Sequence, residues 1–339
     1  MELQDDVKTW LLDSDPALRW QVERDLVDAP ESVWGATRRR MVTDGMAARL
    51  LALQDADGQW DGGAFFPGGA AWFESHPDGS PQPWTATTWT LNTLRDWGLP
   101  AEALAGTADR LAAGSRWDYD DLPFWGGEVD VCVNSFTLAS GAWLGADVSG
   151  LVEWFPEHRL ADGGWNCEWI AGSVRSSFHS TLNALRGILY YEKAVGSTPA
   201  LTEARRSAEE YLLERRLLYR KSTGDVVGAW IDEFAYPLRW RCTALKAVDY
   251  FREAALLDGT APDPRLADAV GLIRAARTTD GTWVQGRSNG GKVWFDVDAP
   301  EGEPSKWLTF FATRALEWWD AAADPIEAGA DEGAGIERS

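Results

Sequence analysis

The feature that most constrains the fold of this chain is a four-residue motif that occurs three times: Asp, Gly, any residue, then Trp. The copies lie at 57–60, 162–165 and 280–283. Glycine adopts the left-handed backbone conformation that ends many helices, and aspartate is common in turns. Each copy therefore predicts a turn that follows a helix, with the Trp packed back between neighbouring elements.

The segments around these motifs carry apolar residues at intervals of three and four, which is typical of amphipathic helices. Each motif is expected to join an outer helix, through a loop, to a second and more apolar helix. The second helices begin roughly 45 to 65 residues apart, the scale of helical-hairpin repeats, and we expect them to form an inner ring. Extended structure is expected only locally, at 293–297. The expected helices span 5–12, 15–27, 46–54, 85–97, 132–145, 179–192, 242–253, 265–277 and 307–319.

The composition limits which domain organisation and which classes of binding partner are expected. The 339 residues are 45% hydrophobic, which suits one domain at 1–320, with N-terminal helices at 1–45 and repeats at 46–319. An acidic tail at 321–339 reads as disordered. The net charge of -21 argues against nucleic acid as a partner. No apolar run is long enough for a transmembrane segment, and the three Cys lack disulfide spacing, so a reducing cytoplasm is expected. Whether the chain has a protein partner is left open by the sequence.

Tryptophan is abundant, with 21 residues beside 12 Phe and 7 Tyr. Aromatic rings supply large apolar faces that can line a cavity, although packing between helices is the alternative use. The candidates for lining a central cavity lie near the expected starts of inner helices: Trp84, Trp89, Trp125, Phe178, Trp240 and Trp307.

Residue types that bind zinc occupy matching positions in two successive repeats. Asp130 and Cys132 begin one inner helix and His179 begins the next, in a chain with only three Cys and three His. With Asp130 as the helix cap and Cys132 in the first turn, both face the mouth of the ring, where His179 can join them. Three protein ligands leave one position for water or substrate, as in catalytic zinc sites. Taken singly, a cap, a buried thiol and a core imidazole are the alternatives.

Cys167 lies twelve residues before His179 and is a possible fourth ligand. A site closed by four protein ligands is structural rather than catalytic.

The Asp-Gly-x-Trp turns resemble the Gln-Trp motifs of squalene-hopene cyclases. That resemblance covers about residues 46–319 and implies an all-α fold, the α/α toroid shared by terpenoid cyclases and protein prenyltransferase β subunits, with about five to six helical hairpins.

The metal pattern is similar to that of protein farnesyl and geranylgeranyl transferases, in which Asp-x-Cys and a later His bind catalytic zinc. Residues 129–132 match the first part and 178–181 the second. This resemblance implies a prenyltransferase-like zinc enzyme acting on an isoprenoid or other apolar substrate. The basic residues that hold a diphosphate in that family are missing from 124–128, so basic side chains would have to enter from other loops. Those available are Arg175, Arg239, Arg241 and Lys306.

Two other functions stay open. Residues 118–121 spell the Asp-x-Asp-Asp acid of class II terpene cyclases, so Asp120 and Asp121, or Asp130 at its helix start, are candidate general acids of a metal-free cyclase. The third possibility is a non-catalytic toroid that binds a lipid or a protein partner and has a structural zinc closed by Cys167.

Overall fold

The computed structural model describes residues 4–78, 80–287 and 289–323, and this part of the chain is mostly helical. The described strands are β1 (Trp283–Val284) and β2 (Pro304–Ser305), which pair antiparallel. The α-helices are α1 (Asp5–Leu12), α2 (Pro16–Asp25), α3 (Glu31–Arg40), α4 (Gly45–Leu51), α5 (Trp72–Ser75), α6 (Thr87–Asp96), α7 (Thr107–Gly114), α8 (Val131–Leu144), α9 (Ser149–Glu157), α10 (Phe178–Ala194), α11 (Pro199–Leu213), α12 (Ala244–Asp258), α13 (Ala267–Ala275) and α14 (Lys306–Ala323).

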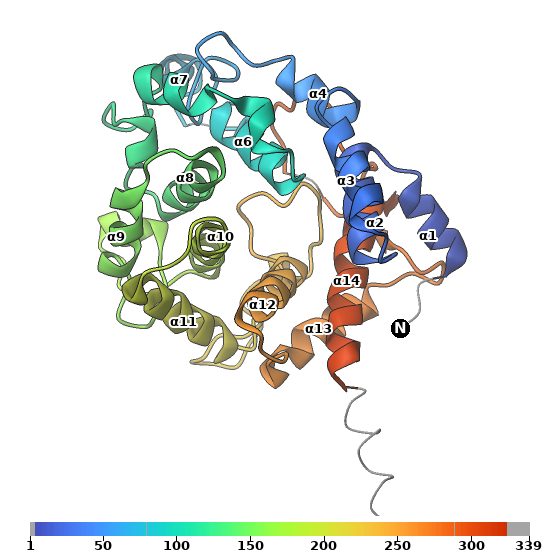
Figure 1. Ribbon diagram of the computed structural model, residues 1–339. Helices are drawn as coiled ribbons and strands as arrows, with labels where there is room; N and C mark the ends of the chain where they lie inside the picture. Colours follow the sequence, from blue (N-terminus) through green and yellow to red (C-terminus); the bar gives the residue numbers. More distant parts are fainter. Residues whose placement is uncertain (1–3, 79, 288, 324–339) are drawn as a thin grey trace, which may run out of the picture.

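From α6 onward, successive long helices alternate between an inner and an outer position. Figure 1 shows α6, α8, α10, α12 and α14 around the middle of the molecule, with α7, α9, α11 and α13 outside them. The N-terminal helices lie beside α14, which contacts α2, and α4 contacts α6. The second helix of each predicted pair thus lies on the inside.

The three Asp-Gly-x-Trp motifs form the same joint between an outer and an inner helix. Trp165 is fully buried, its indole N–H donates to the carbonyl of Phe155 at 3.0 Å, and its backbone N–H donates to the Thr181 hydroxyl at 3.1 Å. Gly163 has a φ of +105°, the left-handed conformation that the motif predicts. The other two copies use the same contacts: Trp60 with Leu50 and Thr87, and Trp283 with Ile273 and Thr309.

The helix at 5–12 has the expected boundaries, and the ends of the other expected helices differ from the observed ones by one to five residues. The helix expected at 242–253 begins at Ala244 because the Thr243 side chain accepts from the Lys246 N–H and caps it. The expected extension at 293–297 is not a strand. Helix α14 runs to Ala323, three residues into the segment expected as a tail; residues 324–339 lie outside the described residues.

Helices α8 and α10 pack closely enough to bring their N-terminal ends together. Gly187 of α10 lies against α8, where an added Cβ would be 2.5 Å from the backbone oxygen of Ser135. This contact sets the separation of the two helices that begin at the candidate metal ligands.

None of the helices within the described ranges is long and apolar enough to cross a lipid bilayer.

Candidate metal centre

Asp130 is the residue that begins α8. Its Oδ1 accepts hydrogen bonds from the backbone N–H groups of Cys132 at 2.7 Å and Val133 at 3.1 Å. These bonds satisfy two donors that a helix N-terminus leaves unpaired, as a capping aspartate does. The cap fixes the carboxylate beside the first turn, where Cys132 lies.

Cys167 reaches the same point from the loop that follows Trp165. It begins a short 3-10 helix, Cys167–Ala171, whose first turn is capped by the Asn166 side chain. The Cys167 backbone N–H donates to the Ser180 hydroxyl at 3.1 Å, on the first turn of α10. The loop is therefore held across the N-terminal end of α10.

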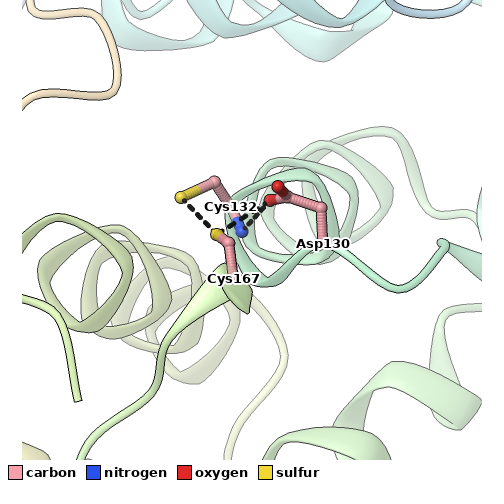
Figure 2. Close-up of side chains that lie close together, drawn as sticks. All are labelled: Asp130, Cys132 and Cys167. Carbon is pink, nitrogen blue, oxygen red and sulfur yellow. Dashed lines mark hydrogen bonds between the residues drawn. The ribbon is translucent and has the colours of Figure 1, made fainter. Parts of the chain in front are cut away.

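The side chains of Asp130, Cys132 and Cys167 converge (Figure 2). The Cys167 sulfur lies 3.1 Å from Asp130 Oδ1 and 3.4 Å from the Cys132 sulfur, and the three candidate ligand atoms lie within 4.8 Å of one another. All three residues are half-buried. The arrangement is a possible metal site built from two thiols and a carboxylate.

His179, expected as the third ligand, lies outside this group of three. Its Nδ1 accepts the backbone N–H of Cys242 at 2.9 Å. A neutral imidazole whose Nδ1 is an acceptor carries its proton on Nε2, and a protonated nitrogen does not bind a metal. Burial, followed by the charges of Lys246 and Arg241, lowers the pKa of His179 to about 4, so the ring is neutral at pH 7. Cys167, expected as a possible fourth ligand, lies with Asp130 and Cys132, and His179 does not belong to this group.

Two side chains of α10 donate hydrogen bonds to the cysteine sulfurs. The Ser180 hydroxyl lies 3.2 Å from the Cys167 sulfur, and the Asn183 amide nitrogen lies 3.3 Å from the Cys132 sulfur. The sequence offered one hint of them, since they follow His179 by one and four residues on the same helix. Such donors stabilise sulfur in its thiolate form.

A buried lysine orients the Asn183 amide. Lys246 donates to Asn183 Oδ1 at 2.8 Å and to the backbone carbonyl of Arg239 at 2.7 Å. Because an ammonium group only donates, the amide oxygen must face Lys246 and the amide nitrogen must face Cys132. Burial, followed by the charge of Arg186, lowers the pKa of Lys246 to about 7.

The pKa values of two acidic groups at the site are raised. The hydrogen bond with Cys167, then burial, raise the pKa of the Cys132 thiol. Burial and the adjacent Asp130 carboxylate raise the pKa of Glu128 to about 7. Negative charge is therefore disfavoured here without a cation, and a bound dication would reverse that preference.

The expected cavity-lining aromatic residues have several different roles. Trp84 and Trp89 form a buried cluster with Phe136, against which Cys132, Phe65 and Trp240 pack. Trp84 lines a cavity of about 450 Å³ and Trp89 one of about 30 Å³. Trp125 and Phe178 pack against nearby residues. The indole N–H of Trp125 donates to the Ala108 carbonyl, and the Phe178 ring contacts the rings of Tyr211 and Trp230. Trp307 stacks on Tyr236 and lines a separate cavity of about 420 Å³.

Two of the three acids proposed for a cyclase, Asp120 and Asp121, do not lie at a helix start. Asp120 and Asp121 are exposed and have φ values of 56° and 53°, so they occupy a tight surface turn. Asp130 is bound to two backbone N–H groups, as described above.

The four basic residues that were candidates for entering the mouth lie in different places. Arg241 pairs with Glu233 at 3.3 Å, Lys306 donates to the Asp13 backbone, and Arg175 is exposed. Arg239 lines the interior cavities.

Comparison of the sequence with protein-family models gives no match, and comparison with curated proteins gives no match either.

Proposed function

We propose that the chain is a zinc-dependent enzyme with an α/α toroid fold, in which Asp130, Cys132 and Cys167 hold the metal at the mouth of the ring. The observation that carries the proposal is the convergence of two thiols and a carboxylate, from segments 35 residues apart, at the ends of two inner helices. Thiolate with carboxylate is a ligand set that zinc accepts.

The alternation of inner and outer helices in Figure 1 supports the toroid. The repeated Trp joint supports it further, because each copy ties the end of one outer helix to the start of the following inner helix. A closed array of such pairs buries the apolar faces of the inner helices on every side.

The spacing of the ligand atoms supports zinc. Two sulfurs bound at about 2.3 Å to a tetrahedral zinc lie about 3.8 Å apart. The 3.4 Å separation of Cys132 and Cys167 needs only a small opening to reach that value. The Ser180 and Asn183 donors are already in place for two thiolates.

Three protein ligands favour a catalytic site over a structural one, because a tetrahedral ion keeps one free position. Zinc held here would supply Lewis-acid activation of a thiol or water in that position. Asn183 and Ser180 would hold the two protein sulfurs in place, and the half-buried setting leaves the position open to a substrate.

The substrate class follows from the prenyltransferase-like metal pattern and from the surroundings of Cys132. The aromatic cluster of Trp84, Trp89 and Phe136 packs against Cys132, so an apolar group bound at the metal would meet aromatic faces. We therefore propose transfer chemistry on a substrate with an isoprenoid or other apolar group. The exposed position of Asp120 and Asp121 gives the metal-free cyclase less support.

Metal analysis of the purified chain tests the site. We expect about one zinc per chain in the wild type, and less than about 0.2 in Asp130→Ala, Cys132→Ala and Cys167→Ala. Cys242→Ala removes the third, buried thiol and is the matched control, which should retain full metal. Full zinc in Cys167→Ala together with loss in His179→Ala would replace the proposed ligand set with the one expected from the resemblance.

Activity separates a catalytic site from a structural one. Zinc-loaded protein should catalyse the reaction of a prenyl diphosphate with a small thiol, which gives a prenyl thioether and releases diphosphate. Removal of zinc by a chelator should abolish this reaction. Turnover that persists in chelator would favour a cyclase. A fully loaded protein that unfolds on chelation, with no turnover of any substrate, would favour a structural zinc.

A further inference from the structure

The interior of the ring contains three adjoining cavities with shared walls. A cavity of about 30 Å³ lies between one of about 450 Å³ and one of about 260 Å³, because it shares Arg239 and Thr93 with the first and Arg95 and Arg186 with the second. Helices α6 and α10 and the loop at 235–239 supply these walls. We call the place where the three meet the junction.

The junction carries an excess of positive charge. Three guanidinium groups line the smallest cavity, those of Arg95, Arg186 and Arg239, and Asp96 is the one acid among its described lining residues. Asp96 lies 3.4 Å from Arg95 and 3.2 Å from Arg186, so one carboxylate is shared between two arginines. This local excess lies inside a chain whose net charge is -21.

Two of these guanidinium groups have unused donors. Arg95 donates to the Ser140 hydroxyl at 2.8 Å, yet its Nε is buried without a partner. The Arg239 guanidinium lies 4.8 Å above the Trp84 ring, and no described residue forms an ion pair or hydrogen bond with it. Burial lowers the pKa of Arg239 to about 10 and also lowers that of Arg95. Arg239 has no counter-charge among the described residues, and Arg95 shares Asp96 with Arg186. A buried cation without a full counter-charge is costly, so these groups favour an anion.

The acids that line the two larger cavities do not supply the missing charge. None of those in the 450 Å³ cavity forms an ion pair with Arg239 among the described residues, and these are Asp296, Asp298 and Glu301. In the 260 Å³ cavity, Asp249 pairs with Arg314 at 2.7 Å and Glu253 pairs with Lys193 at 2.7 Å. Burial raises the pKa of Asp96, but the charges of Arg186 and Arg95 outweigh it, so the pKa of Asp96 is lowered and it stays ionised. Three arginines against one carboxylate leave about two positive charges at the junction.

We propose that the junction binds a dianionic oxyanion group, such as the phosphate of a small molecule, through Arg95, Arg186 and Arg239. Guanidinium groups bind phosphate oxygens in a bidentate manner, and two unmatched charges favour a dianion over a carboxylate. The remainder of such a molecule would extend into the 450 Å³ cavity, where Trp84 and Trp294 supply apolar faces. The site does not require the metal.

Calorimetric titration of the zinc-loaded chain with inorganic phosphate, at ionic strength matched with sodium chloride, tests the proposal. We expect a dissociation constant of about 1 mM or tighter, weakened about tenfold or more in Arg186→Gln and in Arg239→Gln. Arg39→Gln, an exposed arginine elsewhere, is the matched control and should bind as the wild type does. Phenyl phosphate should bind at least as tightly as phosphate, and benzoate more weakly.

Folding of each variant is checked by its circular dichroism and melting temperature without phosphate, and Arg239→Lys, which keeps the charge, should lie between the wild type and Arg239→Gln. The proposal is overturned if phosphate gives no heat beyond chloride, if the two Gln variants bind normally, or if benzoate binds as tightly as phenyl phosphate. Cys132→Ala should still bind phosphate. Loss of binding there would place the anion at the metal and not at the junction, whereas normal binding in a chain that holds no zinc would separate this site from the proposed enzyme.

Discussion

The thiol sulfur of Cys132 lies 3.4 Å from that of Cys167, although the two residues come from an inner helix and from the loop after the next outer helix. This pair makes a direct prediction about metal removal. In metal-free protein, the oxidant diamide should take two hydrogens from the thiols and join them in a disulfide, lowering the mass by about 2 Da. Zinc should protect the pair. Mass spectrometry of Cys242→Ala with and without zinc measures this, and equal oxidation rates in the two samples would contradict a metal on these sulfurs.

The Asn183 amide should tune metal affinity without being a ligand. Asn183→Ala removes the donor to Cys132 and should weaken zinc binding about tenfold, with full occupancy still reached at saturation. Competition with a chromogenic chelator measures the constant. Asn92→Ala, on α6, alters an amide that makes no described hydrogen bond to either cysteine and serves as the control. A loss of stoichiometry in Asn183→Ala would instead place Asn183 among the ligands.

The Trp joint should contribute stability through its hydrogen bond as well as its bulk. Trp165→Phe keeps an aromatic ring but leaves the Phe155 carbonyl without its donor, and should lower the free energy of unfolding by about 1–3 kcal/mol. Trp319→Phe, a half-buried Trp near the end of α14, should cost less. Urea denaturation of both variants gives the comparison, and equal losses would show that only ring packing matters.

Close contact between α8 and α10 should be sensitive to one methyl group. Gly187→Ala places a Cβ 2.5 Å from the Ser135 carbonyl oxygen, and should destabilise the fold by about 1–3 kcal/mol and weaken metal binding as the helix ends separate. Gly271→Ala, in α13, meets nothing within 4 Å and should instead stabilise by up to about 1 kcal/mol. Similar effects of both substitutions would argue against the close approach.

Protonation of His179 should destabilise the metal-free protein in acid. Its folded pKa of about 4 lies below the unfolded value of about 6.5. The unfolded chain therefore binds the proton first, and the stability that neutral His179 supports is lost as the pH falls from 6.5 to 4. After allowance for partial exposure, the loss should be less than about 3 kcal/mol. Urea titrations in chelator should show a flatter profile for His179→Asn, and parallel profiles would exclude His179 as the source.

Local signals made the helices and the metal-ligand candidates at α8 predictable. The Asp-Gly-x-Trp turns depend on the glycine conformation and on a buried ring, both of which are properties of a few adjacent residues. Asp130 and Cys132 lie within one helical turn, so their relation also follows from local geometry.

The exchange of His179 for Cys167 was not predictable in the same way. It depends on the loop at 166–177, in which the Cys167 backbone N–H donates a hydrogen bond to the Ser180 hydroxyl. It also depends on the segment before α12, in which the Cys242 backbone N–H donates a hydrogen bond to His179 Nδ1. The first contact joins residues 13 positions apart and the second joins residues 63 positions apart, so neither follows from the geometry of a single helical turn. Arg95 and Arg186 were unexpected for a related reason, since nothing in a single apolar helix shows that its one arginine will line the same cavity as an arginine of another helix.

One of the three Trp joints closes over a shorter connection than the other two. The threonine that completes the joint follows its Trp by 27, 16 and 26 residues. The same joint therefore forms with different numbers of residues between its two anchoring points, the Trp and the Thr. Lengthening the connection between them adds little entropic cost. The segments between the two anchoring points can be exchanged, extended or shortened while the helices keep their positions, so these loops can diverge among proteins built this way without any loss of the scaffold.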